Sequence, residues 1–413
     1  MKIDWLKPLV GHPGPFATVY LDATRSVEAG DKDVANRWRS VRRSLAKQGA
    51  TDTVLSDLDA SVDRPTWVHG PHGRVLIADD EGVLVDRVLR EPPPVMAGVW
   101  HRVPSLLQAA RSADEEVDAL CVAIDRSGAD FFAVGSDGRP AGEKDTFEGP
   151  DDEISKTSST STKRSVIESR AEDSWHRNAE AVAGEIDRRV AERRPEIVLI
   201  TGDVRAVHMV RDALGQQAAQ VTVEVPGGGR DDGVHVGPFA ETVADALDSF
   251  RERRREQVLA ELREGLGREA GAVTSIGDVA QVLARGQVKQ LVLSEELADD
   301  AARALHAWVD GSVEEPGLGG LLNGFQLFIG PDPMHIAASR AELEGVGELE
   351  ELPAATALLR AAIGQDAGLV FAPEGSVELR DGVGATLRWH DGGTPHESAA
   401  TMSGDDGRVS AAH

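Results

Sequence analysis

Residues 31–49, DKDVANRWRSVRRSLAKQG, contain six basic residues, five of them close together over 37–47, within a chain that is otherwise strongly acidic. Apolar residues recur there at helical spacing, which predicts a helix that ends at Gly49. The cations occupy its remaining face: Arg37, Arg39, Arg42, Arg43 and Lys47. Because a guanidinium group can hold two phosphate oxygens at once, this face could contact a nucleic-acid backbone. The alternative is a solvated helix face whose apolar side covers a core.

A second local group of cations lies in residues 152–175, DEISKTSSTSTKRSVIESRAEDSW. The first half is polar, rich in Ser and Thr, and carries Lys156, Lys163 and Arg164. In the second half Ser165 and Glu168 fit a helix capping box. We therefore predict a polar stretch over about 136–164, followed by a long helix that begins at Ser165. Its three cations form a second patch able to attract phosphate.

Motifs for metal or catalytic sites are weak in this sequence. HGPHG places His69 and His72 in what we expect to be a surface loop, without further ligands nearby, so we expect no metal. PGGGRDDG lacks the lysine and hydroxyl of a P-loop, and we expect it to be a mobile loop. Cys121, the only cysteine, lies in an apolar strand and is expected to behave as a small buried hydrophobe. We expect no cofactor.

Composition limits the class of protein. The 413 residues are 41% hydrophobic and 28% charged, which is typical of a globular chain, and the formal net charge is -26. Such acidity argues against a broad nucleic-acid-binding surface and leaves local basic patches as the only route to RNA. No apolar run reaches the length of about 18 residues that a membrane helix needs, and we see no signal peptide. These features predict a cytoplasmic protein with no membrane or DNA partner.

The apolar patterns divide the chain into three blocks. The first combines a strand over 16–21, the basic helix and a hairpin that turns at Asp80-Glu81. The second has a hairpin, VDALCVAID and ADFFAVG, then the long helix, the strands PEIVLITG and AAQVTVEV with a helix between them, and a charged helix over about 239–266. The third contains two helix–strand pairs and a last strand in GVGATLRW. This alternation predicts an α/β fold.

We predict three small α/β domains over residues 1–115, 116–266 and 267–390. Residues 391–413 are dominated by Gly, Ser, Asp and His and are predicted to form a disordered tail.

Three stretches carry a family resemblance: GPFATVYLD near the N-terminus, GQVKQLVLSEEL in the third block and DGVGATLRW at its end. In this order they resemble the bacterial branch of the archaeo-eukaryotic release factor superfamily, and within it the actinobacterial proteins related to Balon and Pelota. The resemblance covers about residues 1–390. It implies an N-terminal domain that faces the decoding site, a ribonuclease-H-like middle domain and an L7Ae/L30e-like C-terminal domain. It also implies action at the ribosomal A site beside a translational GTPase such as elongation factor Tu.

The chain departs from the release factors of this superfamily at one motif. Those factors carry Gly-Gly-Gln on the loop before the long middle-domain helix, and this chain contains no such tripeptide. The resemblance therefore implies a non-catalytic ribosome-binding translation factor that occupies the A site, of hibernation or rescue type. One alternative is a peptidyl-tRNA hydrolase or tRNA-cleaving enzyme that uses Lys163, Arg164 and His176, with His176 as acid or base. Another is an acidic, stress-linked scaffold that binds protein partners.

Overall fold

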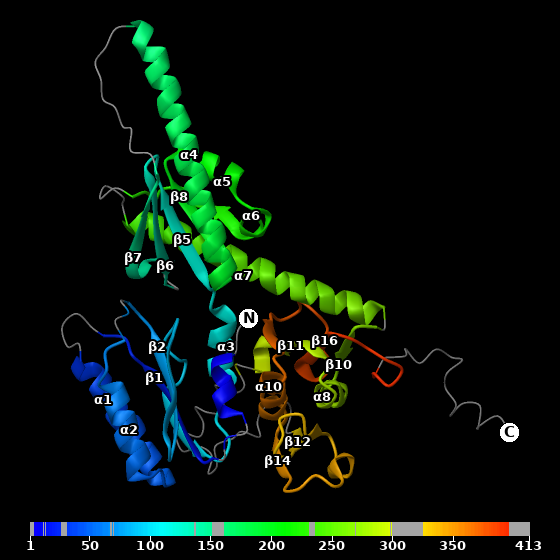
Figure 1. The fold of residues 1–413 in the computed structure, drawn as a ribbon. Coiled ribbons are helices and arrows are strands. Elements are labelled where there is room, and N and C mark those ends of the chain that lie inside the picture. Colours follow the sequence, from blue (N-terminus) through cyan, green and yellow to red (C-terminus); the bar gives the residue numbers. More distant parts are fainter. Residues whose placement is uncertain are drawn as a thin grey trace, which may run out of the picture. The chain divides into compact units, whose positions relative to one another are not determined.

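The computed structural model forms two compact units, unit 1 from Met1–Glu115 with Arg254–His413 and unit 2 from Glu116–Arg253. Both combine sheets with helices, so the predicted α/β class is confirmed (Figure 1). The structure describes residues 4–10, 12, 14–25, 31–66, 68, 70–135, 138–150, 161–230, 236–268, 270–297, 299 and 325–395.

The N-terminal part of unit 1 is an antiparallel sheet in the order β3-β2-β1-β4. Its strands are β1 (Phe16–Asp22), β2 (Gly73–Asp79), β3 (Gly82–Leu89) and β4 (Ala97–His101). Alternate residues of β1 face opposite sides, as the two-residue period of a strand requires. Val19 and Leu21 pack against α1 (Asp31–Gln48) and α2 (Asp52–Val62), whereas Phe16 and Tyr20 face a second core that includes α3 (Leu107–Glu115).

The C-terminal part of unit 1 contains a mixed sheet in the order β10-β16-β11-β15. Its strands are β10 (Ala272–Thr274), β11 (Val288–Ser294), β15 (Gly368–Ala372) and β16 (Val383–Leu387). The helices α8 (Ile276–Ala284) and α10 (Ala354–Gly364) pack on one face, and the end of α7 (Val236–Gly267) packs on the other. A smaller sheet contains β12 (Gln326–Ile329), β13 (Ile336–Ala337) and β14 (Glu350–Pro353). The short 3₁₀ helices are η1 (Asp4–Leu9), η3 (Arg340–Leu343) and η4 (Arg380–Gly382).

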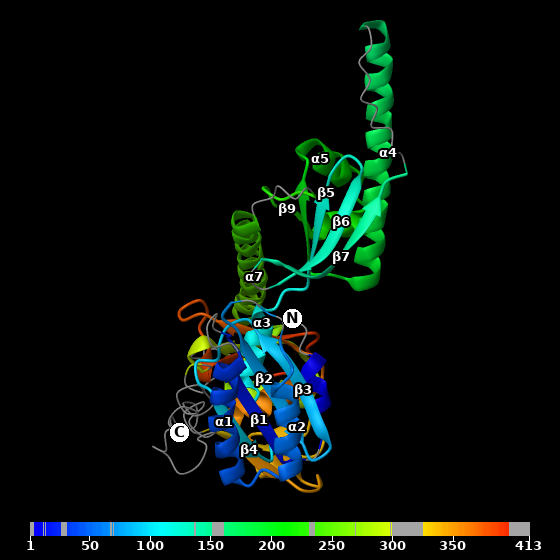
Figure 2. The ribbon, with the colours of Figure 1, turned by 90° about the vertical axis from the view of Figure 1, so that its left-hand side faces the viewer.

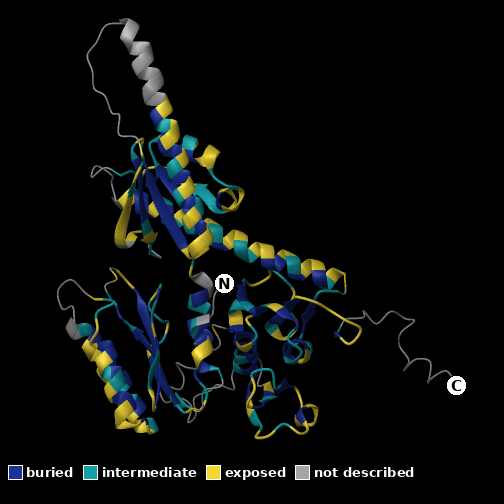
Figure 3. Ribbon diagram, in the orientation of Figure 1, coloured by how far each residue is buried: buried dark blue, intermediate teal, exposed yellow. Residues whose placement is uncertain are grey.

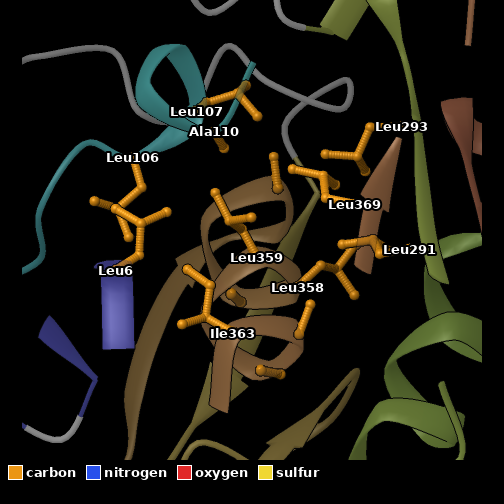
Figure 4. Packing of buried hydrophobic residues seen from close by; sticks show 14 of the residues in the cluster. Leu6, Leu106, Leu107, Ala110, Leu291, Leu293, Leu358, Leu359, Ile363 and Leu369 are labelled. Atoms are coloured by element: carbon orange, nitrogen blue, oxygen red, sulfur yellow. The ribbon is translucent and has the colours of Figure 1, made fainter. Parts of the chain in front are cut away.

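One hydrophobic core joins the two ends of the chain within unit 1. Leu6 and Leu106 lie beside Leu359 and Ile363 of α10, and all four side chains are buried (Figure 4). Helix α10 is therefore covered partly by residues more than 240 positions away in the sequence. The first and third predicted blocks consequently form one folding unit here, which their separate apolar patterns did not indicate.

Unit 2 is built on a five-stranded sheet in the order β7-β6-β5-β8-β9, in which only β6 runs antiparallel to its neighbours. This arrangement is that of the ribonuclease-H-like fold. The strands are β5 (Ala119–Ile124), β6 (Gly128–Val134), β7 (Pro140–Glu148), β8 (Ile197–Gly202) and β9 (Thr222–Glu224). Three helices cover one face: α4 (Ser161–Arg193), α5 (Val204–Ala213) and α6 (Gln216–Val221). The first part of α7 covers the other face.

Helix α4 is the longest element of unit 2 and projects beyond the sheet (Figure 2). At about 1.5 Å per residue its 33 residues span about 50 Å. Its buried side runs from Ala179 through Val182 and Ile186 to Val190. The helix begins at Ser161 rather than at the predicted cap Ser165. Neither Pro nor Gly stands among the intervening residues, so nothing local ends the helix there.

Several elements differ from the sequence prediction. Helix α2, strand β4 and helix α3 were not predicted, and β7 lies inside the stretch predicted to be polar and irregular. Strand β7 has little apolar pattern because it is an edge strand, so its pairing with β6 rather than burial defines it. Helix α6 takes the first four residues of the predicted strand AAQVTVEV, and β9 takes the next three. Residues 391–395, predicted to belong to the tail, contain a turn in which Asp391 pairs with Arg285, and 396–413 lie outside the described residues.

Candidate nucleic-acid interface

The carboxyl ends of β5, β8 and β9 share one edge of the unit 2 sheet, because these strands are parallel. Open α/β sheets bind ligands at this kind of edge. Gly202 ends β8 with a positive φ of 130°, and a Cβ there would lie 1.8 Å from the carbonyl oxygen of Ile124. Only glycine permits so close an approach of the two strand ends. Polar residues follow each strand at this edge: Asp125 and Arg126 after β5, Asp203 after β8 and Arg230 after β9.

Arg230 links three strands of unit 2 through its guanidinium group, and its side chain is only 10% exposed. It donates to Asp125 Oδ1 at 2.8 Å and to Ser127 Oγ at 2.9 Å. It also pairs with Asp130 on β6 at 3.3 Å and with Glu148 at the end of β7. The loop PGGGRDDG was predicted to be a mobile connection, but its arginine anchors the edge of the sheet.

The charges of this cluster are mutually stabilised. Burial opposes ionisation of Asp125, but hydrogen bonds from Ser127 and Arg230 outweigh it and hold the pKa of this carboxyl below its usual range. Burial likewise opposes ionisation of Asp130, and hydrogen bonds from Lys144 and Thr146 outweigh it, so that its pKa is also lowered. Both carboxylates therefore stay charged and paired at neutral pH.

Two exposed arginines around a half-buried tryptophan lie beside this cluster. The guanidinium carbon of Arg126 stands 4.3 Å from the ring centroid of Trp175, and that of Arg205 stands 5.2 Å from it. Arg126 also pairs with Asp203 at 3.3 Å. Asn178, one turn after Trp175 on α4, is buried and donates from Nδ2 to the carbonyl oxygen of Arg126 at 3.0 Å. We call Arg126, Trp175 and Arg205 the tryptophan platform.

The structure divides the predicted cations of α1 into two groups. Arg37 donates to the carbonyl oxygens of Asp22 and Thr24, and Arg42 donates to both carboxylate oxygens of Asp59 at 3.0 Å. These two arginines hold α1 to β1 and α2. Figure 3 shows the exposed outer face of α1.

The remaining three α1 cations are spaced four residues apart and are exposed: Arg39, Arg43 and Lys47. Residues at this spacing lie above one another on one side of a helix. Among the described residues, none of the hydrogen bonds or ion pairs involves these three side chains. We call them the α1 cation row. Its members are available to a partner, whereas Arg37 and Arg42 serve the fold.

The predicted tip residues are only partly described. Lys156 lies outside the described residues, and for Lys163 and Arg164 the structure describes the backbone alone, in the first turn of α4. His176 is exposed on α4, next to Trp175. In the described part of the chain no hydrogen bond or ion pair involves His176, and its role as acid or base stays a prediction.

The residues weighed for metal binding and thiol chemistry have structural roles where they are described. His72 is buried rather than in a surface loop, and its ring contacts Thr66 Oγ1 at 2.7 Å and the carbonyl oxygen of Gly70 at 2.9 Å. His69 lies outside the described residues. Within the described ranges no group of three or more His, Cys, Asp or Glu side chains could hold a metal ion. Cys121 is fully buried, as predicted, and burial raises the pKa of its thiol to about 12.

Sequence reasoning missed the tryptophan platform and the Arg230 cluster. Trp175 lies within the predicted long helix, and Arg126 lies in the predicted hairpin between VDALCVAID and ADFFAVG. The available signal was positional: charged residues directly follow β5 and β8, whose carboxyl ends meet at one edge because the two strands pair in parallel. Separately, none of the helices that the structure describes is long and apolar enough to span a membrane.

Comparison with known proteins identifies relatives of the middle segment and of most of the chain. Residues 118–268 match the family model described as bacterial archaeo-eukaryotic release factor family 2. The uncharacterized proteins Rv2629 and MT2704 of two Mycobacterium tuberculosis strains are each 26% identical over 313 residues, which is 71% of this chain and 79% of theirs.

Solved structures of translation factors also match over most of their length, at low similarity. The archaeal termination factor aRF1 is 16% identical with a TM-score of 0.20, over 93% of this chain and 95% of the other. Pelota from Archaeoglobus fulgidus is 12% identical with a TM-score of 0.30, over 94% and 91%. An archaeal Pelota from a ribosome-bound model with ABCE1 is 11% identical with a TM-score of 0.38, over 93% and 92%. At these values they say nothing about the chemistry of this chain.

Proposed function

We propose that this chain, whose residues 118–268 belong to bacterial archaeo-eukaryotic release factor family 2, is a non-catalytic factor that binds the ribosome. It occupies the A site, in hibernation or rescue, beside a translational GTPase, and it acts in the cytoplasm. The family match of the middle segment is the observation that carries the proposal.

The exposed cations support an RNA partner. The α1 cation row combines two guanidinium groups and one ammonium group along about 12 Å of helix, since eight residues separate its ends. Guanidinium forks match the geometry of phosphate oxygens. The tryptophan platform adds two further exposed guanidinium groups, those of Arg126 and Arg205.

The net charge of -26 limits the part of the surface that RNA can contact. Most of the surface repels RNA, so only the basic patches can approach it, and contact is restricted to a defined orientation. Binding should therefore depend steeply on a few residues rather than on the whole surface.

Ribosome co-sedimentation of the double variant Arg39→Glu/Arg43→Glu tests the proposal. The wild-type chain is expected to pellet with ribosomes, and the variant is expected to lose most of this binding. The dependence of binding on salt should also flatten, by about 0.7–0.9 in the logarithmic slope for each phosphate that the variant no longer neutralises. Arg39 and Arg43 make no described contact within the fold, so the variant should retain its thermal stability.

The matched control is Arg193→Glu/Arg340→Glu, which changes net charge equally at two exposed positions on other elements. Loss of binding by the control as well would mean that overall charge, rather than the α1 cation row, governs association. Absence of the wild-type chain from ribosomes of both growing and starved cells would overturn the proposed function and favour a protein-binding scaffold.

A further inference from the structure

We infer that the tryptophan platform of unit 2 binds an unpaired base of single-stranded RNA, with Arg126 as the stacking surface and Arg205 as the phosphate contact. The guanidinium group of Arg126 packs over the Trp175 ring. An unpaired base stacks on the other face of this guanidinium group. Nothing in the family match assigns a role to these three residues.

Arg126 is immobilised by its neighbours. Its backbone carbonyl is held by the buried Asn178, and its guanidinium group is held by the Trp175 ring and by Asp203. Its side chain nevertheless remains 46% exposed. An exposed arginine usually loses much rotamer freedom when it binds a ligand, and this one has lost that freedom before binding. Preorganisation of this kind increases affinity for a planar partner.

The neighbouring acid is itself fixed. Asp203 caps α5, since its Oδ1 accepts from the backbone nitrogen of Ala206 at 3.0 Å. Its backbone nitrogen donates to the carbonyl oxygen of Ile124 at 2.9 Å, which ties it to the end of β5. The position of Arg126 is therefore set by the core of unit 2, rather than by a surface loop.

The chemistry favours single-stranded RNA over other anionic partners. Unpaired bases stack on aromatic rings and on guanidinium planes, with little dependence on sequence. The bases of a duplex are already stacked and cannot reach such a surface, and an acidic peptide offers charge without a π plane. Arg205 is exposed in the first turn of α5, beside the ring, where it can reach the phosphate that follows the stacked base.

The negative charge of Asp203 allows a test in which RNA affinity is expected to increase. Its carboxylate orients Arg126 but also repels phosphate. Replacement by Asn keeps a good helix cap and removes the charge. In the variant Asp203→Asn the Trp175 ring and the Asn178 contact still hold Arg126. The loss of negative charge should therefore dominate, and the variant should bind RNA more tightly than the wild-type chain.

The inference rests on the proposed function for its class of partner, but its test does not use ribosomes. Fluorescence anisotropy with a labelled, unstructured RNA of about twelve nucleotides measures affinity for the full-length chain, within the usual site size of single-strand binders. We expect Trp175→Ala and Arg126→Lys each to weaken binding about tenfold, since Lys keeps the charge but has no plane. Trp175→Phe should retain much of the affinity.

The chain offers a matched control in unit 1. Trp389 is 47% exposed, and the guanidinium carbon of Arg285 lies 6.0 Å from its ring centroid. Trp389→Ala should leave RNA affinity unchanged. Thermal unfolding of each variant separates weaker binding from impaired folding, and the prediction for Asp203→Asn is a gain that unfolding cannot mimic.

Three results would overturn the inference: equal affinity of Arg126→Lys and wild-type chain, equal competition by duplex RNA or polyglutamate, or loss of affinity in Trp389→Ala. Binding of the oligonucleotide without ribosome co-sedimentation would leave the platform in place and refute the proposed function. Ribosome co-sedimentation that survives while no oligonucleotide binds would do the reverse.

Discussion

At the residue scale, the arginines of this chain divide into those that hold the fold and those that remain exposed. Arg230, Arg37 and Arg42 each satisfy carboxylates or carbonyl oxygens of neighbouring elements. Arg39 and Arg43 have no such partner in the described part of the chain. In an acidic protein an arginine normally finds a carboxylate nearby, so an exposed row without one is a feature that the surface composition alone would not produce.

Removal of Arg230 should lower the unfolding free energy, because the carboxylates of its cluster lose their cation. Arg230→Met leaves Asp130 and Asp125 with fewer partners at a partly buried site, and we expect a loss of up to about 3 kcal/mol of unfolding free energy. Chemical denaturation monitored by circular dichroism measures it. Arg188→Met, at an exposed arginine of α4 that pairs with Glu185 and Glu192, should change the midpoint little.

The same cluster predicts a dependence of stability on pH. The pKa values of Asp125 and Asp130 are lowered in the folded chain, so their stabilising contribution is present above their unfolded pKa of about 3.9 and is lost as pH falls through the folded values. Melting temperatures should therefore change little through this cluster above about pH 5 and fall below about pH 4. Arg230→Met should show a shallower acid decline, and an identical decline would separate the acid transition from this cluster.

At the element scale, α10 shows how a short helix can organise a large unit. Eight of its eleven residues are buried, so it meets other elements on nearly every side. The residues that are not buried, Thr356, Arg360 and Gly364, recur every four positions, so the polar side of the helix is narrow.

Truncation within α10 should therefore destabilise the whole of unit 1. Leu359→Ala removes a fully buried side chain that lies near Leu6 and Leu106 (Figure 4). We expect a loss of about 2–5 kcal/mol in the unfolding free energy. Hydrogen exchange should show increased exchange in β1 as well as in β11, and a change confined to the C-terminal strands would contradict the shared core.

At the scale of the whole molecule, the chain interrupts one folding unit with another. Residues 116–253 separate the two parts of unit 1. The apolar surfaces of the N-terminal sheet and of α10 are each completed by the other part, so neither has a full core without its partner.

Fragment complementation tests this arrangement. Residues 1–115 produced alone should be largely unfolded or aggregated, and co-production with residues 254–395 should restore a soluble complex. Cooperative thermal unfolding of the complex provides the measurement. A monomeric, cooperatively folded 1–115 fragment would show that the N-terminal sheet needs no core from the other end of the chain.

The absence of Gly-Gly-Gln from the sequence leads to a prediction for the complete protein. Ribosomes that carry labelled peptidyl-tRNA should retain both the ester bond and intact tRNA after incubation with the full-length chain. Gel electrophoresis of the labelled species provides the readout. Cleavage that disappears in His176→Ala would identify the enzymatic alternative, whereas cleavage that persists in that variant would point to other residues.

The sequence by itself determined the α/β class, the principal strands and the buried position of Cys121. These features follow from local apolar periods and from short motifs, which are readable along the chain. It also indicated a basic face on α1, but it did not distinguish the exposed cations from those that bind other elements of the fold.

Only the tertiary structure decided which of those cations are exposed, because Asp22, Thr24 and Asp59 approach α1 from other elements. The same holds for the tryptophan platform, whose members come from a hairpin turn, α4 and α5. Their proximity depends on the parallel pairing of β5 and β8, which lie more than 70 residues apart. Contacts at that separation are set by sheet order and core packing, and no local pattern records them.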